Sequence, residues 1–429
     1  MVDISPFQGL VYNKKKAGDL SNLISPPYDV ISGDLRKKLT GSTHHNIVNL
    51  ILPEGGSNNK YDNAKDLLND WINEDILQFD KDRSYYMIEI GFSAGGKARS
   101  ITGFIGLTKI EPYSQNIVLR HEKTLLKPRE DRYSLLKSSR TNFGLIYTVY
   151  RDRKKLVPRV LESYKDTKPF ADIIPGYDRG LSLKLWRITD QKDIAVITDS
   201  MMDKKILIAD GHHRYETSLM YRDKSGVSGI ISGSDKEQCP EGYVLTLFME
   251  SGQEDIKIYP TYRSIKFDDF TDFGIFLKKS SKCFDINNIN IKTADDITSF
   301  LDRLREKSVN GFIFYVKKDS FYSFTAKTKR SENKDFCFPI KKLDVDILHG
   351  LMINQLEDLY GSSEIIYNHN FDLIIKSVNN GSADLGVFLN PPTIEEMEEI
   401  CNSGKLMPQK STFFWPKPST GLVMYKFDK

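Results

Sequence analysis

One short segment near the middle of the chain constrains the fold more than any other. The apolar run Lys205-Ile206-Leu207 is typical of a buried strand, Gly211 allows a tight turn, and a helical pattern begins near Tyr215. A strand that ends in a glycine turn and continues into a helix directs backbone N–H groups and the positive end of the helix dipole at one place. The connection is therefore suited to holding a phosphate group.

Ionisable side chains crowd the same turn. Arg214 could hold phosphate oxygens through two N–H groups at once, and His212 or His213 could donate to the phosphate or shuttle a proton. Asp210 could orient an imidazole, hold Mg²⁺ or accept a proton from an attacking hydroxyl. The alternative is a solvated turn whose histidines cap the helix. Because convergent ionisable groups mark functional sites, we expect a site here.

Composition excludes some classes of protein. The chain has 429 residues, with 61 basic and 58 acidic side chains, so no overall field favours nucleic acid or an anionic membrane. Its apolar runs are far shorter than the roughly 20 residues of a membrane helix, and its N-terminus resembles no signal peptide, which predicts a cytoplasmic protein. The widely spaced cysteines are interpreted as isolated reduced thiols. They are Cys239, Cys283, Cys337 and Cys401.

The order of apolar patterns predicts a mixed α/β fold in three segments. We expect an N-terminal α+β segment at 1–110, a phosphate-binding core at 111–265 and a C-terminal α/β domain at 266–429. Further predictions concern individual elements. They are a helix over 61–77, paired strands at 84–92 and 99–110 around Gly95-Gly96, a hairpin at 311–326, a long helix over 345–360 and a capping box at Thr393.

A second charged cluster lies upstream, at Arg120-His121-Glu122, and a solvated surface turn is an equally good interpretation of it. Tyr28 and Asp29 follow two prolines, and such a stiffened turn can hold side chains over a pocket. The run Lys410-Ser411-Thr412 could close over an anion or simply form a terminal strand. His44-His45 and His349 are interpreted as surface, capping or packing residues.

Four motifs carry a resemblance to known families. They are Ser5-Pro6-Phe7, Pro27-Tyr28-Asp29-Val30, the run from Ala209 to Thr217 and the run from Met407 to Thr412. Together they resemble a large bacterial and archaeal family of unknown function. The middle segment is similar to the ParB/sulfiredoxin superfamily, and within it to the ADP-dependent free-serine kinases, which carry Asp-Gly-His-His-Arg between a strand and a helix and a glutamate after an upstream histidine.

The resemblance implies a role for each matching residue. Glu122 and Asp210 would be the catalytic carboxylates, and His213 would contact the transferred phosphate. Other residues would line the phosphate or nucleotide site, and these are Gly211, His212, Arg214, Arg120 and His121. Thr261 would join Tyr28, Asp29 and the 410–412 run in contacting substrate. The chain departs from the kinases in the longer stretch between Glu122 and Asp210, and in its terminal segments.

We therefore expect a phosphotransfer enzyme that interconverts free L-serine and O-phospho-L-serine, with Mg²⁺ and with ADP or ATP as donor. The reaction could run as a serine kinase or as a phosphoserine phosphatase. One alternative is a nucleotide-binding ParB-like switch without small-molecule catalysis, although no basic stripe is visible. Another is a metal-dependent hydrolase built on His212, His213 and an acidic residue. Neither a membrane nor a nucleic acid is expected as partner, and the oligomeric state is open.

Overall fold

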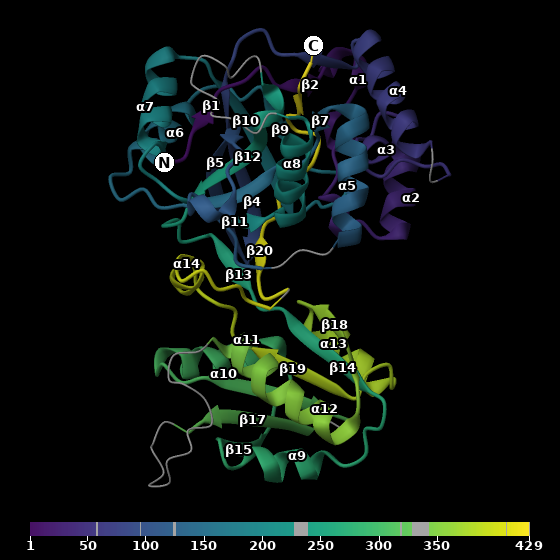
Figure 1. Cartoon of the computed structure of the whole chain (residues 1–429), viewed down its shortest axis with the longest axis vertical. Coiled ribbons are helices and arrows are strands. Elements are labelled where there is room, and N and C mark those ends of the chain that lie inside the picture. The colour runs from purple at the N-terminus through teal and green to yellow at the C-terminus, as the bar shows by residue number, and fades with distance from the viewer. Residues whose placement is uncertain are drawn as a thin grey trace. The chain divides into compact units, whose positions relative to one another are not determined.

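The computed structural model describes residues 1–56, 59–94, 96–122, 126–226, 239–317, 320–327, 343–408 and 410–428 (Figure 1). The chain forms two compact units. The first contains residues 1–120, 124–257 and 416–429, and the second contains residues 121–123 and 258–415. The predicted boundary near residue 110 lies inside the first unit, and the one near residue 265 lies inside a strand of the second.

The first unit is built on one large mixed sheet, which confirms the mixed α/β class. Its strand order is β6-β11-β8-β12-β5-β4-β10-β9, and β1 pairs with β5. The strands are β1 Ile4–Ser5, β4 Tyr85–Ala94, β5 Lys97–Lys109, β6 Val118–Leu119, β8 Ile146–Tyr150, β9 Ala171–Ile173, β10 Leu181–Ile188, β11 Ile206–Asp210 and β12 Tyr243–Glu250. Two small ladders join β2 Leu10–Tyr12 to β3 Leu77–Phe79 and β7 Thr141–Asn142 to β21 Tyr425–Lys426.

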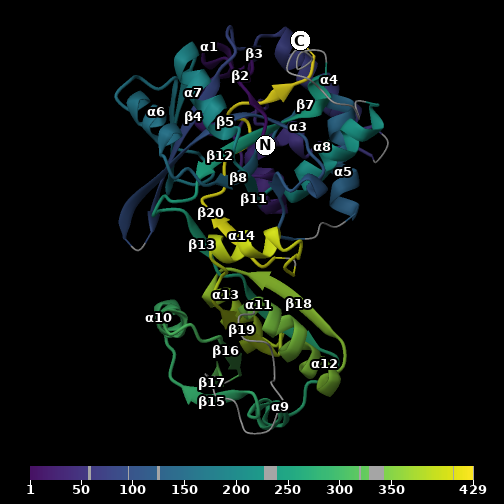
Figure 2. The ribbon, with the colours of Figure 1, turned by 60° about the vertical axis from the view of Figure 1, so that its left-hand side comes forward.

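Helices pack against this sheet. The α-helices are α1 Lys14–Ala17, α2 Gly33–Ser42, α3 Val48–Ile51, α4 Lys60–Asn73, α5 Leu126–Ser139, α6 Leu156–Tyr164, α7 Gln191–Met201 and α8 His212–Lys224. Short 3-10 turns lie at Leu20–Asn22, Tyr28–Val30, Tyr113–Gln115 and Pro240–Gly242. Residues of α6 and α7 share one apolar core with the sheet, and Tyr215 of α8 belongs to the same core. In Figures 1 and 2, α5 and α8 run side by side.

The second unit has its own six-stranded sheet, in the order β15-β17-β16-β19-β14-β18. The strands of this unit are β14 Tyr262–Phe267, β15 Phe284–Ile289, β16 Gly311–Val316, β17 Ser320–Ala326, β18 Ser363–Asn368 and β19 Leu385–Leu389, with β13 Lys257–Tyr259 pairing β20 Phe413–Trp415 outside the sheet. Its α-helices are α9 Phe273–Ser280, α10 Ala294–Glu306, α11 Asp344–Ile347, α12 Asn354–Tyr360, α13 Phe371–Asn379 and α14 Ile394–Asn402. Separate apolar clusters lie on the two faces of this sheet.

Several predicted elements are present in the structure. Strands β4 and β5 pair antiparallel, with Ala94 opposite Lys97, and Gly95 lies outside the described residues. Strands β16 and β17 form the predicted hairpin, and Thr393 with Glu396 forms the predicted capping box of α14. The alternation of apolar residues and the local capping chemistry were sufficient for these elements because neither depends on distant parts of the chain.

Three predictions need correction. The helix predicted over 61–77 is α4, and it ends at Asn73, because the chain then turns at Asp75 (φ 57°) into β3. The helix predicted over 345–360 is interrupted by a π-helical segment, Leu348–Ile353. The cysteines are not all reduced: Cys283 is disulfide-bonded, whereas Cys239 and Cys401 are free and Cys337 lies outside the described residues. A fold can bring distant cysteines together without any signature in their spacing.

Candidate functional site

The strand–turn–helix connection forms as expected, with one difference in register. Asp210 is the last residue of β11, and Gly211 follows with φ +99°, a left-handed conformation that favours glycine. Helix α8 begins at His212 rather than near Tyr215, so both histidines lie in its first turn. The N-cap residue is Gly211, which has no side chain to occupy the first N–H groups of the helix. This start of α8 is the centre of the candidate site.

Arg214 is fixed close to the backbone on two sides. It donates through Nη2 to Asp210 and through Nη1 to the carbonyl of Leu145. A Cβ on Gly211 would lie 3.1 Å from its Nε, and a Cβ on Gly144 would lie 3.2 Å from its Nη1. The two glycines therefore let the guanidinium lie directly against both backbones.

A lysine from the far end of the chain completes this cluster. Lys417 Nζ lies 2.5 Å from Asp210 Oδ1 and 3.5 Å from Asp29 Oδ2. The side chains of Lys417 and Asp210 are only 11% and 13% exposed. Sequence reasoning missed Lys417, and the only local signal is its position between Pro416 and Pro418, which stiffen the backbone around it. The predicted residues Asp29 and Asp210 are thus brought together through a residue that was not predicted.

Charge interactions dominate the protonation of this cluster. Burial alone would raise the pKa of Asp210, but the charges of Lys417 and Arg214 outweigh it and hold the pKa well below its usual range. Burial lowers the pKa of Lys417, but the carboxylates of Asp210 and Asp29 have the larger effect, and the pKa of Lys417 lies above its usual value. Both groups are therefore ionised at neutral pH.

The cluster does not have the donor set of a magnesium site. Among the residues that the structure describes, no group of three or more His, Cys, Asp or Glu side chains could hold a metal ion. The two oxygens of Asp210 accept from Lys417 and Arg214, and the Lys417 ammonium lies between Asp210 and Asp29, where a divalent cation would otherwise bridge them. The residues present do not fit a protein-held Mg²⁺, so we derive no step through one.

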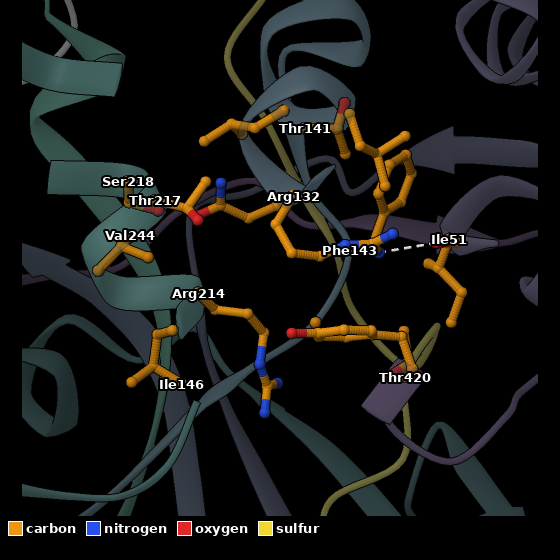
Figure 3. Close-up of a pocket in the computed structure, with 15 residues that line it drawn as sticks. Ile51, Arg132, Thr141, Phe143, Ile146, Arg214, Thr217, Ser218, Val244 and Thr420 are labelled. Carbon is orange, nitrogen blue, oxygen red and sulfur yellow. Dashed lines mark hydrogen bonds between the residues drawn. The ribbon is translucent and has the colours of Figure 1, made fainter. Parts of the chain in front are cut away.

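An open pocket adjoins Arg214. In Figure 3 Arg214, Thr217 and Ser218 of α8 lie on one side of it, with Ile51 and Thr420 opposite. The remaining lining residues come from α5, the β7–β8 region, β12 and the Pro-stiffened turn. They are Tyr28, Arg132, Leu135, Leu136, Thr141, Asn142, Phe143, Gly144, Ile146 and Val244. The pocket thus combines apolar walls with a few hydroxyl and guanidinium groups.

The predicted residue Tyr28 lines this pocket. The guanidinium of Arg132 lies over its ring, 4.3 Å from the centroid. Arg132 donates to Asp131 through Nε and Nη2 and to the carbonyl of Ile51 through Nη1. Burial raises the pKa of Tyr28 above its usual value, so its hydroxyl stays protonated at neutral pH. The N-terminal segment thereby forms one wall of the pocket.

The predicted cluster Arg120-His121-Glu122 is divided between the two units. In the first unit, Arg120 Nη1 donates to Glu216 Oε1 at 2.9 Å, and Arg129 Nη1 donates to Glu216 Oε2 at 3.1 Å. Glu216 lies on α8, is 7% exposed, and is neutralised by both arginines. Arg120 is therefore tied to the same helix as Arg214.

In the second unit, His121 and Glu122 contact the predicted run at 410–412. The Nε2 of His121 and the Oγ1 of Thr412 are 2.8 Å apart, and the backbone N–H of Lys410 donates to Glu122 Oε2 at 3.2 Å. The hydroxyl of Ser411 donates to the carbonyl of Pro408. The structure therefore joins two segments that the sequence suggested separately. Predicted residue Thr261 is buried in this unit too.

The two histidines of the motif differ in burial. His212 is 3% exposed, whereas His213 is partly exposed at the start of α8. Consecutive residues on a helix point about 100° apart, so the two imidazoles face different surroundings. Contact of His213 with a phosphate therefore stays a prediction.

The fold defines a mixed α/β protein in which strand β11, the turn at Gly211 and helix α8 follow one another. Residues 4–346 match the family described as "Protein of unknown function (DUF1015)", and the chain belongs to this family. No curated protein matches the chain in sequence.

Several solved structures resemble the chain distantly. A free serine kinase in complex with AMP is 16% identical, with a TM-score of 0.34 over 70% of this chain and 84% of that chain. A conserved hypothetical protein from Pyrococcus furiosus is 14% identical, with a TM-score of 0.33 over 70% and 87%. SbnI with a C-terminal truncation, from Staphylococcus aureus, is 10% identical, with a TM-score of 0.34 over 74% and 86%. These likenesses are too distant to assign a function.

The part of the chain that the structure describes contains no helix long and apolar enough to span a lipid bilayer.

Proposed function

We propose that this protein is a phosphotransfer enzyme that acts on free L-serine or O-phospho-L-serine, with ADP or ATP as the donor in the kinase direction. The observation that carries the proposal is the pair of cations, Arg214 and Lys417, held by Asp210 at the start of α8 beside an open pocket. The choice of serine rests on the resemblance of the Asp210–Arg214 motif to the free-serine kinases.

Arg214 is equipped to bind phosphate oxygens. A guanidinium has five N–H donors, and within the described residues Arg214 uses two of them, toward Asp210 and Leu145. Because those two bonds fix its orientation, less conformational entropy is lost when a further acceptor binds. The positive end of the α8 dipole adds to the attraction for an anion. A phosphate would therefore find donors that are already in place.

Within this proposal Asp210 positions the cations rather than accepting a proton. A carboxylate whose pKa lies well below neutral is a poor base, because proton transfer is most effective when the pKa is near the working pH. We keep Glu122 as the proposed proton acceptor, on the local resemblance of His121-Glu122. In the kinase direction the serine oxygen would attack the terminal phosphorus of the nucleotide, the bond to the leaving nucleotide would break, and the hydroxyl proton would pass to a carboxylate, the role that the resemblance gives to Glu122.

The pocket beside Arg214 would take the nucleoside. Its apolar walls suit a planar base, and the hydroxyls of Thr217, Ser218 and Thr420 offer hydrogen bonds to a ribose or a base edge. His213 would contact the transferred phosphate. A cytoplasmic location remains part of the proposal, and so does Mg²⁺, which would have to arrive with the nucleotide. Adding EDTA to the assay below should abolish turnover if Mg²⁺ is required.

The proposed phosphoryl transfer can be tested by identifying the phosphorylated products. Full-length protein is incubated with L-serine plus ADP or ATP, and separately with O-phospho-L-serine with and without AMP, and products are identified by ³¹P NMR. Glu122→Gln should lower turnover by about 10²- to 10⁴-fold, whereas the exposed α5 variant Glu130→Gln should not. The absence of transfer or release in every mixture would overturn the proposal, and nucleotide binding without turnover would favour the ParB-like switch.

A further inference from the structure

Among the residues that the structure describes, the second unit contains a buried arginine without a carboxylate partner. Arg263 lies on β14, between Tyr367 of β18 and Val387 of β19, and it is 1% exposed. Within the described residues it forms no ion pair. A buried charge without a counter-charge is costly, so it is seldom retained for packing alone.

The hydrogen bonds of Arg263 leave one edge of its guanidinium incompletely bonded within the described residues. Its Nη1 donates to the carbonyl of Thr261, whereas its Nε has no hydrogen-bond partner within the described residues. Its Nη2 lies 3.5 Å from the Nε2 of His349, at the outer limit of a hydrogen bond. This edge, formed by Nε and Nη2, is one that binds the two oxygens of a carboxylate side by side.

Arg132 in the first unit shows how a structural arginine is satisfied in this protein. It is also buried, but its Nε and Nη2 both donate to the carboxylate of Asp131 and its Nη1 donates to the carbonyl of Ile51. Arg263 has the equivalent carbonyl contact on Nη1 and, in the part of the chain that the structure describes, lacks the carboxylate. The difference between the two arginines is therefore one carboxylate group.

Two partly exposed side chains adjoin the guanidinium of Arg263. The ring of Tyr367 lies 5.4 Å from its guanidinium carbon, and His349 lies on the π-helical segment Leu348–Ile353. Such segments occur mostly as single wide turns, often at functional sites. Burial, and then the charge of Arg263, lower the pKa of His349 to about 4, so its imidazole is neutral at pH 7. A neutral side chain can be displaced from Nη2 by an anion without losing an ion pair.

We propose that Arg263 is the recognition group of a binding site for small carboxylates in the second unit, closed by His349 and Tyr367. The ligand carboxylate would accept from Nε and Nη2, and the imidazole of His349 would move aside to admit it. This site is independent of the phosphotransfer proposal, because it uses none of the residues at the start of α8.

The binding test compares molecules that differ in the carboxylate. The full chain is titrated by calorimetry with L-serine, L-lactate, ethanolamine, which is serine without its carboxylate, and inorganic phosphate. We expect the two carboxylates to bind, and Arg263→Met to weaken them by about tenfold or more. Arg303→Met, which removes an exposed charge from α10 of the same unit, should leave both affinities unchanged. Serine binding that is lost in an Arg214 variant but not in Arg263→Met would belong to the α8 site.

Thermal unfolding gives a second, independent readout. If Arg263 is retained for a ligand, Arg263→Met should keep or raise the unfolding midpoint of the ligand-free protein, because an apolar side chain replaces an uncompensated charge. A lowered midpoint together with unchanged carboxylate affinities would show that Arg263 serves packing alone and would overturn the proposal. Binding of phosphate but not of carboxylates, lost in the same variant, would also overturn it. Arg263→Lys, which keeps the charge without the two-donor edge, should lose carboxylate binding and remain folded.

Discussion

The ammonium of Lys417 lies 2.5 Å from a carboxylate oxygen of Asp210, although 207 residues separate them in the chain. The same ammonium reaches Asp29, and the other oxygen of Asp210 accepts from Arg214. One carboxylate thus holds two cations at the start of α8. This arrangement links the N-terminal turn, the central motif and the C-terminal residues of the first unit in a single cluster.

Removing the lysine should destabilise the protein, because Asp210 would remain buried with one cation instead of two. Lys417→Met is expected to lower the free energy of unfolding by about 2–3 kcal/mol, measured by urea denaturation. The matched control is Lys426→Met, whose partner Asp428 is about half exposed, and it should cost less than about 1 kcal/mol. Equal effects of the two substitutions would contradict the importance of the buried pair.

The glycine of the turn should be sensitive to substitution for two separable reasons. Gly211→Ala would put a side chain on a residue with φ +99° and would place the new Cβ 3.1 Å from Arg214. The control is Gly226→Ala, because Gly226 also has a positive φ, 75°, but its Cβ would have no atom within 4 Å. We expect Gly226→Ala to lower the free energy of unfolding by about 1–2 kcal/mol, because a side chain disfavours the left-handed backbone conformation. Gly211→Ala should cost more and should also weaken nucleotide binding. If calorimetry shows the same unfolding enthalpy and midpoint for both variants, the close approach of Arg214 is unimportant.

The pKa of Asp344, in the second unit, is shifted in the opposite direction to that of Asp210, so its effect on stability depends on pH in the opposite sense. Burial raises the pKa of Asp344 to about 6, although Asn310 donates to it at 2.7 Å. Because the folded pKa exceeds the unfolded value of about 4, its contribution to stability is present below pH 4 and is lost as the pH rises through 6. The advantage of Asp344→Asn over the wild type should therefore grow between pH 4 and 6 and stay constant above. A pH-independent difference would contradict the assignment.

Local patterns in the sequence were sufficient for the elements that carry the site. The apolar run before Asp210 and the turn at Gly211 predicted β11 and α8, because strand burial and glycine φ depend on a few neighbouring residues. The start of α8 was misplaced by three residues, since the polar His212 and His213 do not show the apolar spacing by which a helix is recognised. Lys417 could not be predicted, because its contact with Asp210 depends on how the whole first unit folds.

The surroundings of Arg263 could not be predicted either, because they are formed by residues that are distant in the chain. Within the described residues Arg263 forms no ion pair, and its local sequence could not show this, because the neighbours of Arg263 depend on which strands flank β14. His349 was interpreted as a surface or packing residue of one long helix, and the π-helical segment that carries it was not foreseen. The disulfide at Cys283 was missed for the same reason. By contrast, His121, Glu122 and the 410–412 run were each noticed from their local chemistry before the structure joined them.

The most direct test of the central claim is equilibrium binding of ADP to the full chain and to two variants, Arg214→Gln and Lys417→Gln. We expect each variant to bind ADP at least about tenfold more weakly than the wild type, because each loses a positive charge at the start of α8. Lys426→Gln should bind like the wild type. Unchanged ADP affinity in both site variants would contradict the assignment of the start of α8 as the phosphate site.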